Sequence, residues 1–255
     1  MTLFDAPGTV RVRAVVAYDG TDYSGFAVQT SGPRTIGGAL TDALSRVLGH
    51  PIELTCAGRT DAGVHAWGQV ISFDAREDTL DLELVQRSVN KQLRPQIAIR
   101  SIECASPDFD ARFSATARRY RYRILNTPAP SPFLARTAWW IDAPLDVKSM
   151  RLACDPLIGE HDFSSFCRRP NADASLTRRV VDARWNPCDD GRLEFWIEAN
   201  ASCHQMVRSI VGTLTEVGLG KKRAGDVTAI LQAADRSVAG QMAPPHGLCL
   251  WEVRY

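Results

Sequence analysis

The sequence predicts an α+β fold built from two tandem ferredoxin-like units, each with the order strand, helix, strand, strand, helix, strand. Apolar residues switch repeatedly between alternate spacing and helical spacing, and the order seen in the first half recurs in the second. Breaker-rich segments at 107–116 and 126–132 lie near the junction, which predicts domains at 1–107 and 108–255. We expect the two antiparallel sheets to lie side by side around a central cleft.

The first half supplies the expected elements in order. Short apolar or alternating runs predict strands at 10–18, 52–57, 69–73 and 97–104. Helical spacing of apolar residues predicts helices at 36–48 and 82–93. Asp81 stands where the second helix needs an N-cap, and Gly49 stands where the first needs a C-terminal cap.

The second half repeats this order. Strands are predicted at 118–125, 178–185, 193–199 and 248–254. Helices are predicted at 147–158 and 206–217, and an extra helix at 227–234.

Composition narrows the class of protein. The 255 residues are 45% apolar and 23% charged, as in globular proteins, and no apolar run approaches the length of a membrane span. Residues 1–7 lack a basic stretch followed by an apolar one, so we expect no secretion signal and a cytoplasmic location. The seven cysteines are scattered and never form a C-x-x-C pair, which predicts reduced thiols and no structural zinc.

The charge is uneven although the net charge is only +1. Basic residues gather beyond Asp110, at Arg112, Arg118, Arg119, Arg121, Arg123, Arg168–Arg169, Arg178–Arg179 and Lys221–Arg223. Any one pair is most simply a solvated surface. Together, the clusters favour an anionic polymer as partner.

One loop carries the clearest functional signal. The run from Gly58 to Ala66, GRTDAGVHA, places glycines, an arginine and an aspartate between two apolar segments. Glycines permit a tight, partly left-handed backbone, and a loop held in this way to display Asp61 points to catalysis. An ordinary hairpin turn with a solvated aspartate is the alternative.

This run resembles the GRTDxGVHA signature of the tRNA pseudouridine synthase A (TruA) family. Further blocks that look like the family's motifs follow the family's order, at Tyr18–Phe26, Arg112–Tyr122, Gly159–Phe166, Met206–Gly212 and Ala243–Leu248. The resemblance therefore covers nearly the whole chain. Departures are Ala27 for glutamine, Ile36–Gly38 for Val-Gln-Gly or Val-Gln-Glu, and Ser202–Gln205 for Phe-Leu-His-His. The last flanks Arg208, so it bears on local packing around the substrate.

The resemblance implies an isomerase that breaks the N1–C1′ bond of a uridine in tRNA, turns the base and rejoins it through C5. This reaction requires no redox change, energy source or metal, so we expect no cofactor. Asp61 is expected to act as the nucleophile, and Arg208 to hold it ionised as its ion-pair partner. Tyr120 would stack on the base and transfer a proton, and Leu248 would pack on the other face of the base.

The partner is then tRNA, whose target base must leave the stack. Arg59 could occupy the vacated space, and Arg118, Arg119 and Arg121 are expected to bind the substrate through phosphates. The resemblance also implies action on positions 38–40 of the anticodon stem-loop by a homodimer.

Alternatives remain at this level. A catalytically silent tRNA-binding protein of the same fold would not need Asp61, and a hydrolase would use Asp61 with a histidine. Simpler roles are a surface arginine for Arg208, a core tyrosine for Tyr120, as for Tyr122, and a core leucine for Leu248. His65 is expected to be structural, with a bond to the loop backbone. Analysis of the reaction product distinguishes an isomerase from a hydrolase, because isomerisation leaves the RNA chain and the mass of its bases unchanged.

Overall fold

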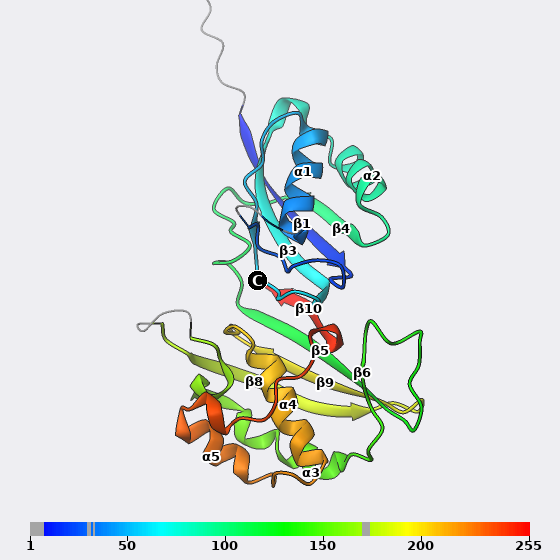
Figure 1. Cartoon of the computed structure of the whole chain (residues 1–255). Helices are drawn as coiled ribbons and strands as arrows, with labels where there is room; N and C mark the ends of the chain where they lie inside the picture. Colours follow the sequence, from blue (N-terminus) through cyan, green and yellow to red (C-terminus); the bar gives the residue numbers. More distant parts are fainter. Residues whose placement is uncertain (1–7, 30–31, 33, 170–173) are drawn as a thin grey trace, which may run out of the picture. The chain divides into compact units, whose positions relative to one another are not determined.

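The computed structural model describes residues 8–29, 32, 34–169 and 174–255 (Figure 1). The chain divides into unit 1, Met1–Ala115 with Tyr255, and unit 2, Thr116–Arg254. This division lies beyond the expected 107/108 boundary because the following segment packs onto unit 1. The Ala111 amide donates to Ser72 Oγ at 3.1 Å, and the Phe109 and Tyr255 rings lie 4.9 Å apart. The expectation of no secretion signal concerns 1–7, outside the described residues.

Unit 1 shows the expected order of strands and helices. Its elements are β1 (Thr9–Tyr18), α1 (Ile36–Leu48), β2 (Thr55–Cys56), β3 (His65–Arg76), α2 (Leu82–Leu93) and β4 (Ile97–Cys104). The strands form an antiparallel sheet in the order β4-β1-β3-β2. β2 is shorter than expected and β3 is longer, so the loop that carries Asp61 runs directly into a long buried strand.

Local capping and an apolar stripe explain the two helices of unit 1. The Thr35 hydroxyl accepts from Gly38 N at 3.2 Å, and the Asp81 carboxylate accepts from Leu84 N at 2.9 Å. Gly49 closes α1 with φ of 74°, in the left-handed region. α1 and α2 contact one another beside the sheet (Figure 1), and they bury the apolar residues Ile36, Leu40, Leu44, Val85 and Val89.

Unit 2 repeats the pattern with additions. Its elements are β5 (Ala117–Asn126), β6 (Trp139–Ile141), α3 (Val147–Leu152), β7 (Gly159–Asp162), β8 (Thr177–Pro187), β9 (Arg192–Ala199), α4 (Met206–Gly218), α5 (Asp226–Ala233) and β10 (Leu248–Arg254). The sheet runs β10-β5-β9-β8-β7 with antiparallel neighbours, and β6 pairs in parallel with β5. The fold is therefore α+β with a mixed sheet.

In unit 2, two strands were not predicted and one helix ends earlier than predicted. β6 and β7 were not predicted, because each is too short for alternation to show. The helix predicted at 147–158 ends at Leu152. Proline lacks the amide hydrogen that a continuing helix would need, and Pro156 lies instead in the 3₁₀ turn Asp155–Leu157. Other 3₁₀ turns lie at Glu77–Thr79, Ser164–Phe166, Arg236–Val238 and Pro245–Gly247.

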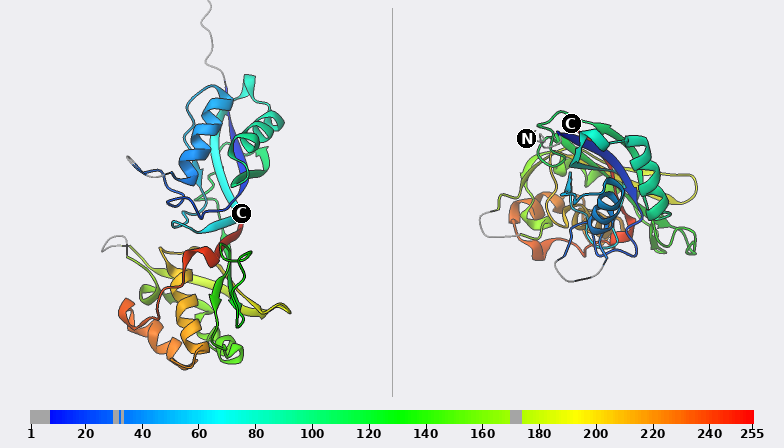
Figure 2. Two further views of the ribbon diagram at one scale, coloured as in Figure 1. Left: turned by 45° about the vertical axis from the view of Figure 1, so that its right-hand side comes forward. Right: turned by 90° about the horizontal axis from the view of Figure 1, so that it is seen from above.

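α4 forms the centre of the unit 2 core. Arg208 and nearly every other residue of this helix are buried, and α3 packs against it. Figure 2 shows α4 lying along the sheet of this unit. No helix among the described residues is long and apolar enough to cross a membrane.

Candidate active site

The loop between β2 and β3 presents Asp61 from a backbone fixed on several sides. Thr60 is buried, its carbonyl accepts from Phe26 N at 3.0 Å, and its hydroxyl lies 2.8 Å from the Tyr18 hydroxyl. Val64 N donates to Asp61 O at 3.1 Å, and Gly63 has φ of 77°, as a tight left-handed turn requires. Asp61 itself is half-buried. The simple picture of a solvated hairpin turn does not fit this arrangement.

A buried glutamine anchors the start of the loop. Gln69 Nε2 donates to Gly58 O at 2.6 Å, and Gln69 Oε1 accepts from Gly58 N at 3.3 Å. The same Nε2 lies 3.3 Å from the Tyr18 hydroxyl. Gln69 is fully buried, so its amide groups depend on these protein partners. We did not single out Gln69 from the sequence, although a polar residue inside an apolar strand was the available signal.

The segment Tyr18–Phe26 lies directly against this loop, and two glycines make the approach possible. A methyl group on Gly20 would stand 2.0 Å from Val64 O, and one on Gly25 would stand 2.9 Å from Thr60 O. His65 Nδ1 accepts from Gly20 N at 3.1 Å, which confirms its predicted structural role. Two of the motifs that carry the family resemblance therefore form one local structure.

Positive charge also lies near the loop. Arg59 is exposed, and its charge acts on the thiol of half-buried Cys56. Burial raises the pKa of the Cys56 thiol to about 11, while the charges of Arg59 and Arg112 act in the opposite direction. Cys56 thus remains a neutral thiol near neutral pH, and the ionised thiolate that a nucleophile requires is not formed.

In unit 2, the tyrosines of β5 have different surroundings. Tyr120 is 7% exposed, and its hydroxyl lies 2.9 Å from Ser202 Oγ. Tyr122 is fully buried, donates its hydroxyl hydrogen to Pro244 O at 2.8 Å, and has its pKa raised by burial. This confirms Tyr122 as a core tyrosine. Leu248 is buried and lies opposite Tyr122 in the register of β5 and β10.

Arg208 is buried, so the alternative that it is a surface arginine is wrong. It is 8% exposed, in the first turn of α4. Arg208 Nε donates to Ala243 O at 2.9 Å, and Ala243 N donates back to Arg208 O at 3.0 Å. Its charge also lowers the pKa of Tyr122, against the larger effect of burial. α4, β5 and the segment before β10 therefore meet around Arg208.

The arginines of β5 are divided between the two faces of the sheet. Successive strand residues point to opposite faces, so Arg118 shares the face of Tyr120 whereas Arg119 and Arg121 share the other. Arg118 Nη1 donates to Asn200 O at 2.8 Å. The Arg119 guanidinium lies 4.8 Å from the Trp196 ring centroid.

Arg121 is held even more closely on that second face. Its guanidinium lies 4.0 Å from the Trp251 ring centroid, and its Nη1 lies 3.6 Å from Glu194 Oε1. Burial lowers the pKa of Arg121. Arg119 and Arg121 thus lie on the face of the sheet opposite Tyr120.

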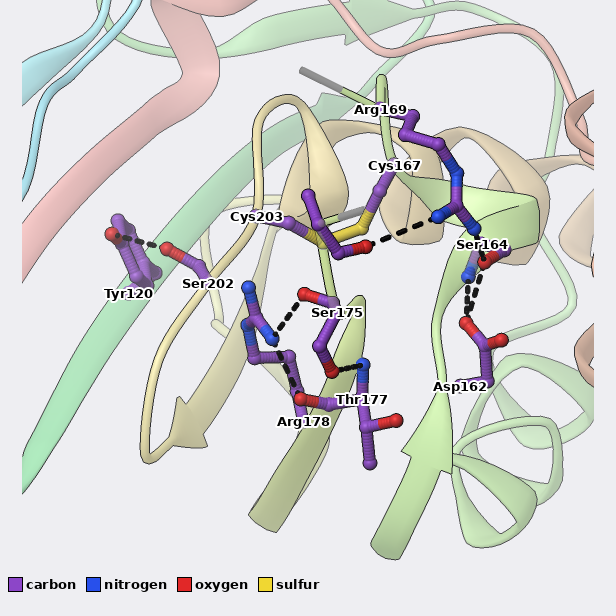
Figure 3. Close-up of a disulfide and its surroundings, with 11 residues drawn as sticks. Tyr120, Asp162, Ser164, Cys167, Arg169, Ser175, Thr177, Arg178, Ser202 and Cys203 are labelled. Carbon is purple, nitrogen blue, oxygen red and sulfur yellow. Dashed lines mark hydrogen bonds between the residues drawn. A yellow bond between two sulfur atoms is a disulfide. The ribbon is translucent and has the colours of Figure 1, made fainter. Parts of the chain in front are cut away.

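The structure corrects the prediction that all cysteines are reduced. Cys167 and Cys203 form a disulfide with a Cα–Cα distance of 5.8 Å (Figure 3), and the other five cysteines are free. The paired residues are 36 positions apart, and their spacing resembles no disulfide motif. The hydrogen bond from Arg168 N to His204 O, 3.0 Å long, shows that tertiary folding brings these segments together.

The predicted site residues belong to both units. Asp61 and Arg59 belong to unit 1, and the remaining ones, Arg118, Arg119, Tyr120, Arg121, Arg208 and Leu248, belong to unit 2. The Asp61–Arg208 ion pair thus joins residues of separate units and stays a prediction. Within the described parts of the chain, no group of three or more His, Cys, Asp or Glu residues could hold a metal ion.

Comparison with known proteins gives a consistent result. The profile of a family described as tRNA pseudouridine synthase matches residues 14–114 and 153–255. A Brevibacillus brevis protein named tRNA pseudouridine synthase A is 43% identical, with 96% of this chain and 99% of the relative covered. Relatives of the same name from Frankia casuarinae (44% identical, 97% and 90% covered) and Pseudothermotoga lettingae (37% identical, 96% and 99% covered) are similar along the chain.

Proposed function

The chain belongs to the tRNA pseudouridine synthase family, and from that premise we propose which uridines it isomerises and which residues act. The enzyme is an isomerase that converts uridine in tRNA to pseudouridine. We place its targets at positions 38–40 of the anticodon stem-loop. The family resemblance supports these positions. The observation that carries the assignment of the reaction is the Asp61 loop, a half-buried carboxylate on a backbone held by Thr60, Tyr18 and Gln69.

Asp61 is the nucleophile, and Arg208 is its ion-pair partner in the working enzyme. The bond from Arg208 Nε to Ala243 O supports this role, because it fixes the direction of a planar guanidinium that could then bind a carboxylate. An arginine beside a carboxylate favours its charged form, which the reaction needs. Asp61 acts on the nucleotide either at C1′ of the sugar or by taking part in proton transfer.

Tyr120 and Leu248 hold the base. Both come from adjacent strands of unit 2, and both side chains are buried among apolar residues. The Tyr120 ring stacks on the uracil, and its hydroxyl exchanges a proton as C5 loses its hydrogen. Exposed Arg59 fills the space that the flipped base leaves, and Arg118, Arg119 and Arg121 bind phosphates. No cofactor takes part.

Each unit is a ferredoxin-like unit in this proposal. The strand order β4-β1-β3-β2 in unit 1 corresponds to β10-β5-β9-β8 in unit 2, with antiparallel neighbours throughout. The family resemblance further supports a homodimer that acts in the cytoplasm. Analytical ultracentrifugation of the purified protein tests the dimer, which should sediment with twice the mass of one chain.

A tRNA transcript with uridines at positions 38–40 tests the activity. After incubation with the enzyme and nuclease digestion, chromatography should show a new nucleoside with the mass of uridine, and the undigested RNA should keep its length. Carbodiimide labelling with primer extension then locates the pseudouridines. Binding without a new nucleoside would favour the catalytically silent alternative, and a shortened RNA would favour a hydrolase. A chelator should leave the rate unchanged.

A further inference from the structure

We propose that Ser202 is a positioning residue that fixes the hydroxyl group of Tyr120 for proton transfer. The inference rests on the proposed function, because it deepens the role given there to Tyr120. It starts from one contact, the 2.9 Å distance between the Tyr120 hydroxyl and Ser202 Oγ (Figure 3). The two residues are 82 positions apart, and Ser202 lies in the segment that departs from the family pattern.

Hydrogen bonds restrain the loop that carries Ser202 on the N-terminal side of this residue. This loop joins β9 to α4. At its start, Asn200 N donates to Arg179 O at 3.0 Å, and Asn200 Oδ1 accepts from Arg179 N at 3.0 Å. Asn200 O also accepts from Arg118 Nη1 at 2.8 Å. β8 and β5 therefore both hold the residue two positions before Ser202.

A disulfide and hydrogen bonds restrain the loop on the C-terminal side of Ser202. Cys203 is bonded to Cys167 through the disulfide (Figure 3). The Cys203 carbonyl accepts from Met206 N at 3.1 Å. His204 O accepts from Arg168 N at 3.0 Å. Ser202 thus stands between restraints on both sides, and the position of its hydroxyl is set before any substrate arrives. Such preorganisation removes the cost of ordering the group during the reaction.

A serine hydroxyl suits this role chemically. It can accept the hydrogen of the phenol or donate its own, so it can remain bonded to Tyr120 before and after a proton moves. Phenylalanine, which the family pattern has at this position, offers neither group. Tyr120 is only 7% exposed, so the phenol depends largely on groups of the protein for its direction.

A double-mutant cycle on the full-length enzyme tests the proposal. Steady-state kcat and KM on the tRNA transcript are measured for the wild type, Ser202→Ala, Tyr120→Phe and the double variant. We expect Ser202→Ala to lower kcat about tenfold with little change in KM, because the effect belongs to the reaction step. The double variant should be no slower than Tyr120→Phe, since Ser202 acts through the hydroxyl that Phe lacks.

Two further variants control for structure. Ser202→Thr keeps the hydroxyl and should restore most of the kcat. Ser106→Ala removes an exposed hydroxyl that bonds Asp108 in unit 1, and it should leave kcat unchanged. Thermal unfolding of each variant confirms that the compared proteins are folded.

The outcomes separate this proposal from the proposed function. An unchanged kcat in Ser202→Ala or in Tyr120→Phe overturns the role of Ser202, and so does an additive loss in the double variant. Failure of Ser202→Thr to restore activity overturns it as well. None of these results touches the assignment of Asp61, which fails only if Asp61→Asn still forms pseudouridine in the same assay.

Discussion

At the scale of single residues, buried polar contacts hold the groups to which we assign the chemistry. Gln69 satisfies both the amide and the carbonyl of Gly58, and Tyr18 meets Thr60 directly before Asp61. Arg208 is held in the same manner by Ala243. Because these groups are oriented in advance, little reorganisation remains for the moment of reaction.

Replacement of Asp61 should separate catalysis from binding. Asp61→Asn removes a charge at nearly constant volume, so we expect no detectable turnover while the Kd for tRNA stays within about threefold of wild type. Single-turnover assays and filter binding measure the two quantities. Substantial residual pseudouridine formation would contradict the assignment of Asp61 as the nucleophile.

The role of Gln69 can be tested by an apolar replacement. Gln69→Leu leaves the backbone groups of Gly58 without their partner, so we expect the free energy of unfolding to fall by about 1–3 kcal/mol and kcat to fall too. Gln86→Leu is the control, because the Gln86 amide bonds the carbonyls of Ile99 and Arg100, which lie outside the Asp61 loop. It should lose stability with no comparable loss of kcat. Equal losses of kcat in both variants would argue against a specific role for Gln69.

At the scale of elements, close backbone approach joins the segment Tyr18–Phe26 to the Asp61 loop. Gly20→Ala would place a methyl group 2.0 Å from Val64 O, and backbone on both sides leaves little room to shift. We expect a loss of about 1–3 kcal/mol in the free energy of unfolding, measured in urea, and a clear loss of kcat.

Gly225→Ala is a matched control for this change. Gly225 has φ of −65°, and nothing lies within 4 Å of an added methyl group. We expect its stability and kcat to be unchanged or its stability to rise slightly. A Gly20→Ala enzyme as stable and as active as this control would show that the close approach does not support the loop.

β5 separates two kinds of surface. The face with Tyr120 and Tyr122 is buried, and Arg208 of α4 acts on Tyr122 through its charge. The opposite face carries Arg119 and Arg121 against Trp196 and Trp251. The proposal that the second face binds tRNA phosphates therefore needs its own test.

Replacement of Arg119 and Arg121 by alanine provides that test. If each arginine contacts one phosphate, the slope of log Kd against log salt concentration should fall by about 0.7–0.9 for each arginine removed. Filter binding at several salt concentrations gives the slope. The double variant Arg87→Ala and Lys91→Ala, on exposed positions of α2, controls for the loss of two positive charges. An unchanged slope would mean that this face does not touch phosphate.

At the scale of the whole molecule, the state of the cysteines is a direct test of the fold. Alkylation of the unfolded, unreduced protein should modify the five free cysteines, and alkylation after reduction should modify all seven. Intact-mass spectrometry counts the added groups, and peptide mapping should locate the difference at Cys167 and Cys203. Seven modified cysteines without reduction would contradict the disulfide. The test matters because thiols are usually kept reduced in the cytoplasm, where we propose that the protein acts.

Much of the fold could be predicted because its signals are local. The helices at 36–48 and 82–93 and the strand at 97–104 were predicted with the bounds that the structure shows. Their apolar spacing lies within the elements, and the caps Asp81 and Gly49 lie directly beside them. The short strands β6 and β7 depend on pairing with β5 and β8, which no local pattern reveals.

The sequence by itself determined the family and the reaction and predicted which residues carry its chemistry, because the Gly58–Ala66 run and the other motifs are contiguous and specific. The alternation along 118–125 also placed Arg119 and Arg121 on the face opposite Tyr120. Only the tertiary structure decided that Arg208 is buried against Ala243, that Ser202 meets Tyr120 and that Cys167 joins Cys203. The physical reason is distance along the chain. These contacts join residues that only the packing of strands and helices brings together, and hydrogen-bond and sulfur chemistry depends on separations of a few ångströms.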